Sequence, residues 1–165
     1  INPLVTLLLG STAERLALLS PVPVWIHRGA RTVLPQKILV PCDLSSRSKH
    51  TIGELDKFKS AFSPSLELFH VREEPLPILD FQSYNLISAQ MMKVDQDNVE
   101  NFKKKNTSYK LVTELGGVVE CIRARAKKFD IIALSPREHS SSSHFMGSIT
   151  AKLLGYGNTP IVIFP

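Results

Sequence analysis

Short apolar runs alternate with helical patterns five times along this chain, and this alternation limits its fold more than any other feature. The runs are expected to be strands, at residues 37–43, 65–71, 109–115, 130–134 and 161–164. The first run is continuous rather than alternating, which is typical of a strand buried on both faces. The pattern therefore predicts an α/β fold, a five-stranded parallel sheet with helices on both faces.

The helical segments between these runs have apolar residues at helical spacing. They are expected near residues 49–62, 82–105, 118–128 and 147–154, with another helix at residues 4–19. On the helix at 82–105 the residues expected to face inward are Leu86, Ile87, Met91, Val94 and Phe102. Each helix is thus predicted to cover the sheet with an apolar face.

The last part of the chain is repeated near its beginning. Gly10 and Gly147 each open a helical segment, and Pro23 and Pro160 each precede an apolar strand at the same distance from the glycine. A repeat of this length is one domain, and the start at Ile1 rather than Met fits a fragment. We therefore expect a tail of a preceding domain (helix and last strand) at residues 1–28, a linker at residues 29–36 and a complete domain at residues 37–165.

The composition is that of an ordinary globular protein, with 43% hydrophobic and 21% charged residues. No apolar run reaches the roughly 18 residues of a membrane span. The net charge is +5, but the basic clusters at residues 103–105 and 123–128 are interpreted as solvated helix faces, without a zinc or RNA-binding pattern. We expect neither nucleic acid nor membrane as a partner. Cys42 and Cys121 match no disulfide or metal spacing, so we expect reduced thiols in a cytoplasmic protein.

Candidate ligand-binding residues follow from the fold, because such sheets bind ligands beyond the carboxyl ends of their strands. Asp43 ends the first expected strand. Its carboxylate is suited to accept hydrogen bonds from a sugar hydroxyl or an adenine amine, or to cap the following turn. Gly147 and Ser148 begin the last helix, where unpaired amides favour an anion. An ordinary serine N-cap accounts for those two residues equally well.

Signals for catalysis are sparse. The chain has neither a Gly-x-Ser-x-Gly elbow nor a P-loop. His70 lies inside an expected strand and is interpreted as a packed or edge histidine. Cys42 precedes Asp43, whose charge would raise the pKa of the thiol and oppose nucleophilic attack. We therefore expect no enzymatic activity, no catalytic residue and no metal site.

Taken together, several segments resemble the universal stress proteins. The matching parts are residues 37–43, residues 68–71, the set Gly116, Val118, Ile122 and Ala126, residues 130–134, and the end of the chain from Gly147-Ser148 to residues 160–163. The resemblance covers about residues 36–164, and residues 10–26 are similar to the end of a second copy. Because the family has two-copy members, the chain is identified as the C-terminal domain of a tandem universal stress protein.

The resemblance implies a sheet in the strand order 3-2-1-4-5 and dimerisation through the last strand, antiparallel to its twin. The strand residues expected to associate are Ile161, Val162, Ile163 and Phe164, either with Val22, Val24, Trp25 and Ile26 or with a second chain. One branch of the family binds ATP. For that branch the implied nucleotide-binding residues are Pro41, Cys42, Asp43, Val71, Leu134, Ser135, Arg137, Gly147, Ser148 and Thr150.

The phosphate loop departs from the family pattern. Ser135 and Glu138 stand where that pattern has glycines, and a side chain obstructs the approach of backbone amides to a phosphate. A carboxylate roughly 5 Å from a phosphate charge would repel it by about 3 kcal/mol at an effective dielectric constant of about 20. We therefore expect weak or no ATP binding, and a role in the stress response through dimerisation and ligand sensing.

Two alternatives stay open. The first is a universal stress protein that binds ATP or AMP with a rearranged phosphate loop. The second is an adenine-nucleotide-using enzyme of the same fold group.

Overall fold

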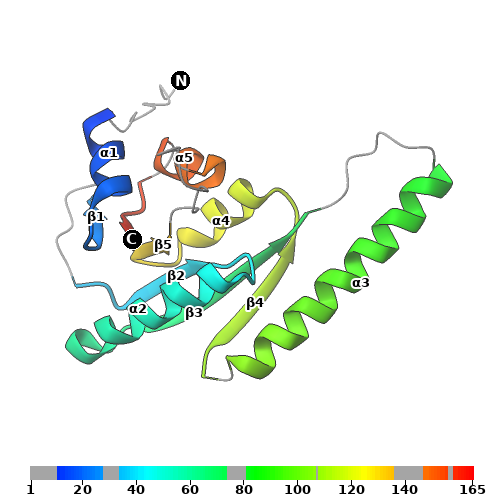
Figure 1. The fold of residues 1–165 in the computed structure, drawn as a ribbon, viewed down its shortest axis with the longest axis horizontal. Helices are drawn as coiled ribbons and strands as arrows, with labels where there is room; N and C mark the ends of the chain where they lie inside the picture. Colours follow the sequence, from blue (N-terminus) through cyan, green and yellow to red (C-terminus); the bar gives the residue numbers. More distant parts are fainter. Residues whose placement is uncertain (1–10, 28–33, 74–80, 107, 136–146, 156–157) are drawn as a thin grey trace.

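A computed structural model describes residues 11–27, 34–73, 81–106, 108–135, 147–155 and 158–165 of the 165-residue chain (Figure 1). The expected helix at residues 4–19 and the linker at residues 29–36 lie partly outside these ranges. The elements in chain order are α1 (Ser11–Leu19), β1 (Val24–Ile26), β2 (Lys37–Pro41), α2 (Ser46–Phe62), β3 (Ser65–Arg72), α3 (Phe81–Lys105), β4 (Lys110–Leu115), α4 (Val118–Ala126), β5 (Ile131–Leu134), α5 (Ser148–Gly155) and β6 (Ile161–Ile163).

The strands form one sheet in the order β1-β6-β5-β2-β3-β4. Neighbouring strands from β6 to β4 pair in parallel. At the other edge, β1 runs antiparallel to β6, with Val24 opposite Ile163 and Ile26 opposite Ile161. The α/β class is confirmed, but the sheet is mixed and has six strands rather than five parallel ones. The reason is that β1 covers the backbone groups that β6 would otherwise present at an open edge.

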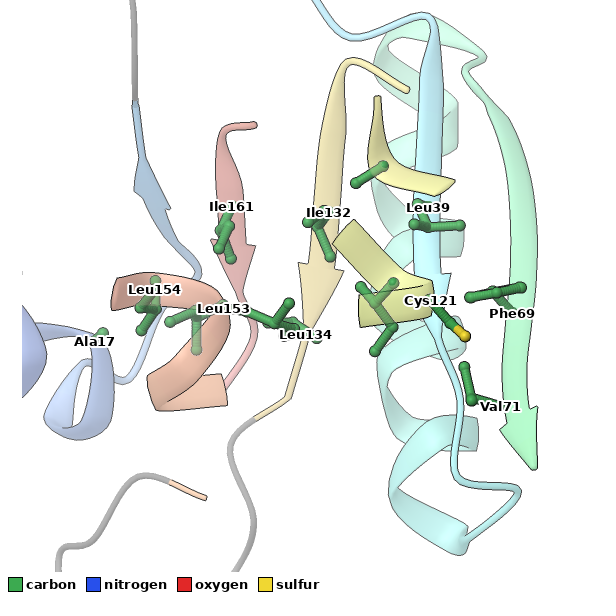
Figure 2. Close-up of a cluster of buried hydrophobic side chains, with 13 residues drawn as sticks. Ala17, Leu39, Phe69, Val71, Cys121, Ile132, Leu134, Leu153, Leu154 and Ile161 are labelled. Atoms are coloured by element: carbon green, nitrogen blue, oxygen red, sulfur yellow. The ribbon is translucent and has the colours of Figure 1, made fainter. Parts of the chain in front are cut away.

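The sheet is buried between two layers of helices. On one face, α4 and α5 pack with the strands, and Ala17 of α1 joins the same cluster beside Leu154 (Figure 2). On the other face, Ile52 and Leu55 of α2 and Phe102 of α3 pack against the sheet. Because α1 and β1 share the core and the sheet with the remainder of the described chain, they are integral to this structure.

Asp130 sets the relative position of the central strands. Its Oδ2 atom accepts hydrogen bonds from the backbone N–H groups of Gln36 and Lys37, both at 2.9 Å, and its own N–H donates to the Lys37 carbonyl at 2.9 Å. These bonds join the beginning of β2 to the residue before β5. The parallel ladder then places Ile38 opposite Ile131, so both strands end at the same edge of the sheet.

Glycine is required at the turn between β4 and α4. Gly116 has φ of +148°, and a Cβ atom there would lie 2.9 Å from the Sγ atom of Cys121. An L side chain rarely adopts this conformation. The turn therefore depends on the backbone freedom of Gly116 and on its lack of a side chain.

The expectation for α3 is only partly correct. Phe102 is buried, as predicted, but Leu86, Ile87, Met91 and Val94 are exposed. The N-terminal half of α3 projects beyond the sheet, whereas its C-terminal end lies beside β4 (Figure 1). Helical spacing identified apolar residues along the whole helix, but the helix is longer than the part that packs against the sheet. Within the described residues, no helix has the length and apolarity to cross a membrane.

Candidate functional site

A pocket of about 310 Å³ lies at the carboxyl edge of the sheet. Its walls come from the ends of β2, β3 and β5 and from the first turns of α2, α4 and α5. From β2 the sheet continues through β3 to β4 on one side, and through β5 to β6 on the other. The pocket therefore lies where the strand order reverses, which is the usual ligand position in sheets of this kind.

The structure brings together nine of the ten residues expected to bind a nucleotide. The residues that line the pocket are Pro41, Cys42, Asp43, Val71, Leu134, Ser135, Gly147, Ser148 and Thr150. The tenth, Arg137, lies outside the described residues, as does Glu138. The nine residues come from separate stretches of sequence, and all of them line this one pocket.

Asp43 both lines the pocket and caps the turn that leads into α2. Its Oδ1 atom accepts hydrogen bonds from the N–H of Ser45 at 3.0 Å and from the hydroxyl of Ser48 at 2.7 Å. Leu44, between Asp43 and Ser45, has φ of 63°, in the left-handed region that such a tight turn uses. Burial alone would raise the pKa of Asp43, but the hydrogen bonds from Ser45 and Ser48 outweigh it and lower that pKa. Asp43 can therefore cap the turn and also accept hydrogen bonds from a ligand, because the cap uses Oδ1 while the carboxylate stays at the pocket wall.

Cys42 is buried in the wall between β2 and β3, where its N–H donates to the Phe69 carbonyl at 2.9 Å. Burial raises the pKa of the Cys42 thiol. Hydrogen bonds with Ser48 and Leu44 oppose this increase without cancelling it, and the charge of Asp43, the smallest of these effects, adds to it. The predicted direction is confirmed, although burial is the larger cause. A thiol held protonated in this way is a poor nucleophile.

Ser135 is tied to α2. Its hydroxyl lies 2.6 Å from the Thr51 hydroxyl, which also donates to the Arg47 carbonyl at 3.2 Å. Ser135 occupies the first position where the nucleotide-binding pattern has a glycine. Its side chain therefore fills that position and also fastens the start of the following loop to a helix.

Gly147 and Ser148 place the start of α5 at the pocket, and Thr150 of the same turn is buried. The N–H of Ala151 donates to the Gly147 carbonyl at 2.9 Å, so helical hydrogen bonding begins at this glycine. The amides that precede this bond have no partner within the helix. The end of α5 that would attract an anion thus lies at the pocket.

Sequence reasoning missed several lining residues, above all Arg47, Thr51, His70 and Glu73. Arg47 and Thr51 are four residues apart and therefore share one face of α2. That spacing, on the helix that follows the first strand, is a signal that could have identified them. Glu73 directly follows β3, and this position after a strand is the only comparable sequence signal that could have identified it.

His70 is buried on β3, as a packed histidine should be, and it also reaches the pocket. Its Nδ1 atom lies 2.8 Å from the Cys42 carbonyl oxygen, and its Nε2 atom lies 2.8 Å from Oδ1 of Asp95 on α3. Each ring nitrogen of His70 thus has an oxygen atom within hydrogen-bond distance, one from the backbone and one from a carboxylate. Sequence reasoning did not find this partner, which is distant along the chain.

Arg72 extends this network. Its Nε atom lies 3.2 Å from Oδ2 of Asp95, and its NH2 group donates to the Thr113 hydroxyl of β4 at 3.0 Å. The Nε–Oδ2 pair is close enough for an ion pair, yet neither of these two atoms has a hydrogen bond of good geometry among the described residues. The attraction between them is therefore mainly that of the two opposite charges.

Neither a protein-family model nor a curated protein sequence matches the chain. Solved structures do. A protein of unknown function from Pseudomonas aeruginosa PAO1 has a TM-score of 0.72 at 17% identity, over 99% of this chain and 59% of that protein. A universal stress protein from Archaeoglobus fulgidus DSM 4304 has a TM-score of 0.64 at 18% identity, over 99% of this chain and 58% of that protein. A universal stress protein in complex with cAMP has a TM-score of 0.51 at 17% identity, over 81% of this chain and 98% of that protein.

The chain thus spans less than two thirds of the first two proteins and nearly all of the third. Likeness at these identities concerns the arrangement of helices and strands, since so few side chains are shared. The chain has the Rossmann-like α/β fold that is found in universal stress protein structures.

Proposed function

We propose that this chain is a ligand-sensing module of the universal stress protein type, acting in the stress response without catalysing a reaction. The convergence of the nine predicted residues on one pocket is the observation that carries this proposal. The likeness of the fold to universal stress protein structures supports it. The raised pKa of Cys42 supports a binding role over a catalytic one, because the thiol remains protonated near neutral pH.

The ligand we propose is an adenine nucleotide with few charges, such as AMP or a cyclic monophosphate. Among the described residues that line the pocket, Arg47 is the only permanently cationic side chain, and it is accompanied by the carboxylates of Asp43 and Glu73. The lowered pKa of Asp43 keeps it ionised at neutral pH. A triphosphate would bring about four negative charges to these groups, so it should bind less well than a monophosphate.

Isothermal titration calorimetry with AMP, cAMP and ATP, each with and without magnesium, tests the proposal. We expect measurable binding of a monophosphate and at least about tenfold weaker binding of ATP, a difference of about 1.4 kcal/mol. Asp43→Asn should weaken the monophosphate severalfold, because a neutral amide oxygen accepts a hydrogen bond from a sugar hydroxyl or an adenine amine less strongly than a carboxylate does. The amide still keeps an oxygen for Ser45 and Ser48. Asp97→Asn, at an exposed position on α3, is the matched control. Sub-micromolar ATP binding, or no binding of any of these ligands, would contradict the proposal.

We also propose that the module associates through its last strand, but only by exchange of β1. In the structure β6 lies between β5 and β1, so it has no open edge for a second chain. A chain pair could form the same antiparallel contact if each β1 paired with the β6 of the other chain, as in domain swapping.

A disulfide between Val24→Cys and Ile163→Cys tests that exchange, because these two residues face one another across the β1–β6 pair. Oxidation at low protein concentration should give a cross-linked monomer, and oxidation of a concentrated sample should add a cross-linked dimer. If only the monomer is cross-linked at every concentration, exchange of β1 does not occur.

A further inference from the structure

The middle of α3 is attached to the sheet by a carboxylate rather than by apolar side chains. Residues 91–98 of this helix are exposed except for Asp95, which is half-buried and faces His70 of β3. Among the described residues of α3, the buried apolar ones, Val99 and Phe102, come only after it. A carboxylate turned inward among exposed apolar side chains breaks the usual pattern, and such exceptions are common at functional positions.

Asp95 reaches the pocket wall through a single side chain. Its Oδ1 atom lies 2.8 Å from Nε2 of His70, and the other ring nitrogen lies 2.8 Å from the Cys42 carbonyl oxygen. His70 lines the pocket, whereas no described residue of α3 does so. The imidazole therefore lies between the ligand space and α3, and it contacts both the wall and the helix.

We propose that ligand binding in the pocket is coupled to the attachment of α3 through the contact between His70 and Asp95. The proposal rests on the function proposed above, since it concerns the same pocket. The His70 side chain keeps 11% of its surface exposed, so a ligand that packs against the ring covers it and restricts its rotation. A ring fixed in this orientation keeps Nε2 beside Asp95. By the same contact, an attached α3 presents a ring that is already oriented for the ligand.

Such coupling acts in both directions with the same factor, because it is a property of the two linked equilibria. Orienting one flexible side chain in advance improves affinity by about three- to tenfold. The ligand should then favour the attached state of α3 over the detached state by that same factor. The middle of α3 suits such a response, because segments with few buried apolar contacts open locally at low cost.

Arg72, the second partner of Asp95, is not part of this coupling. Its Nε atom lies 3.2 Å from Oδ2 of Asp95, but Arg72 does not line the pocket. It should therefore strengthen the attachment of α3 equally with and without a ligand. The two partners of Asp95 can thus be distinguished by experiment.

Calorimetry with AMP or cAMP, whichever binds the wild type more tightly, tests the effect of α3 on the pocket. Asp95→Ala should weaken binding by about three- to tenfold, although Asp95 does not line the pocket. Asp97→Ala, at an exposed position on the same helix, is the matched control and should leave the affinity unchanged. Asp95→Asn should restore most of the affinity, because an amide offers either an oxygen or an N–H to the ring. Circular dichroism confirms that each variant remains folded.

Hydrogen exchange of peptides that cover residues 90–99, with and without saturating AMP or cAMP, tests the effect of the pocket on α3. In the wild type the nucleotide should slow this exchange by about three- to tenfold, the factor found by calorimetry, beyond any slowing in α1. The comparison with α1 removes general stabilisation, because α1 contributes no residue to the pocket. The additional slowing should vanish in Asp95→Ala and persist in Arg72→Met.

The outcomes separate this coupling from the proposed function. A nucleotide that binds but slows exchange in α3 no more than in α1 would overturn the coupling and leave the ligand-sensing function in place. Unchanged affinity in Asp95→Ala, or an Asp95→Asn variant no better than Asp95→Ala, would do the same. If neither nucleotide binds the wild type, the proposed function and the coupling are both wrong.

Discussion

The Nε2 atom of His70 lies 2.8 Å from Oδ1 of Asp95, and through this contact the pocket wall is joined to α3. The other ring nitrogen is held by the Cys42 carbonyl, on the turn that follows β2. One imidazole thus connects the end of β2 with a helix on the outer layer. Because Asp95 also faces Arg72, removing its carboxylate would leave the His70 ring and the Arg72 guanidinium without the carboxylate that they share.

Asp95→Ala should therefore destabilise the fold. Hydrogen bonds to charged groups contribute about 1.5–3 kcal/mol, and an orphaned partner adds its own cost. We expect the free energy of unfolding to fall by about 2 kcal/mol in urea titrations followed by circular dichroism. Asp97→Ala, two residues away and exposed, should change it by less than about 0.5 kcal/mol. Equal effects of the two substitutions would show that the His70–Asp95 contact contributes little.

Gly116→Ala should destabilise the protein, whereas Gly53→Ala should not. At Gly116 the new methyl group meets Cys121 and the backbone is in a strained region for alanine, so a loss of about 1–3 kcal/mol is expected. At Gly53, within α2, a Cβ atom finds no neighbour within 4 Å. Alanine is the better helix former by about 1 kcal/mol, so that variant should be as stable as the wild type or more so. Thermal unfolding of the two variants measures this difference in sign.

Tyr109 should lose its proton late in an alkaline titration. Burial, with a hydrogen bond from its hydroxyl to Asp56 and the charge of that carboxylate, raises the pKa of Tyr109 to about 12. An unperturbed tyrosine has a pKa of about 10. The contribution of this group to stability is therefore complete below about pH 10 and is lost as the pH rises through about 12.

Ultraviolet absorbance of the phenolate follows that titration. Tyr109→Phe should remove the late component and so assign it, and Asp56→Asn should move it back toward the ordinary range. A late component that survives Tyr109→Phe would belong to another tyrosine.

The two loop positions where the nucleotide-binding pattern has glycine, Ser135 and Glu138 in this chain, offer a gain-of-function test. Ser135→Gly combined with Glu138→Gly restores the residue types that the nucleotide-binding pattern has, so ATP affinity should rise by about tenfold or more, or about 1.4 kcal/mol. Thr51→Val is the control for the lost hydrogen bond, since it breaks the contact with Ser135 while keeping the Ser135 side chain. It should leave ATP affinity unchanged. If the double variant gains nothing, the two side chains are not what limits ATP binding.

Much of the candidate site was predictable because of one simple geometric fact. Parallel strands end at the same edge of a sheet, so residues just after them, such as Asp43 and Ser135, must come close together whatever the loops do. The start of α5 at Gly147 follows for the same reason, as it comes after the loop that leaves β5. These inferences needed only the strand ends.

The side-chain contacts that complete the site could not be predicted from the strand ends. His70 and Asp95 lie on elements separated by a stretch of chain that sequence periodicity does not describe. Which side chain meets which across that distance depends on how α3 lies against β3. The same holds for Thr51 and Ser135, which belong to elements far apart in the sequence.

By itself, the sequence determined the α/β class, the continuous buried run of β2 and the edge of the sheet at which a ligand would bind, because local periodicity reports which face of an element is apolar. Only the tertiary structure decided what covers that face. It placed β1 on β6 as a sixth, antiparallel strand, and it left Ile87, Met91 and Val94 of α3 exposed. The physical reason is that burial depends on the length and position of the neighbouring elements, which a local pattern does not encode.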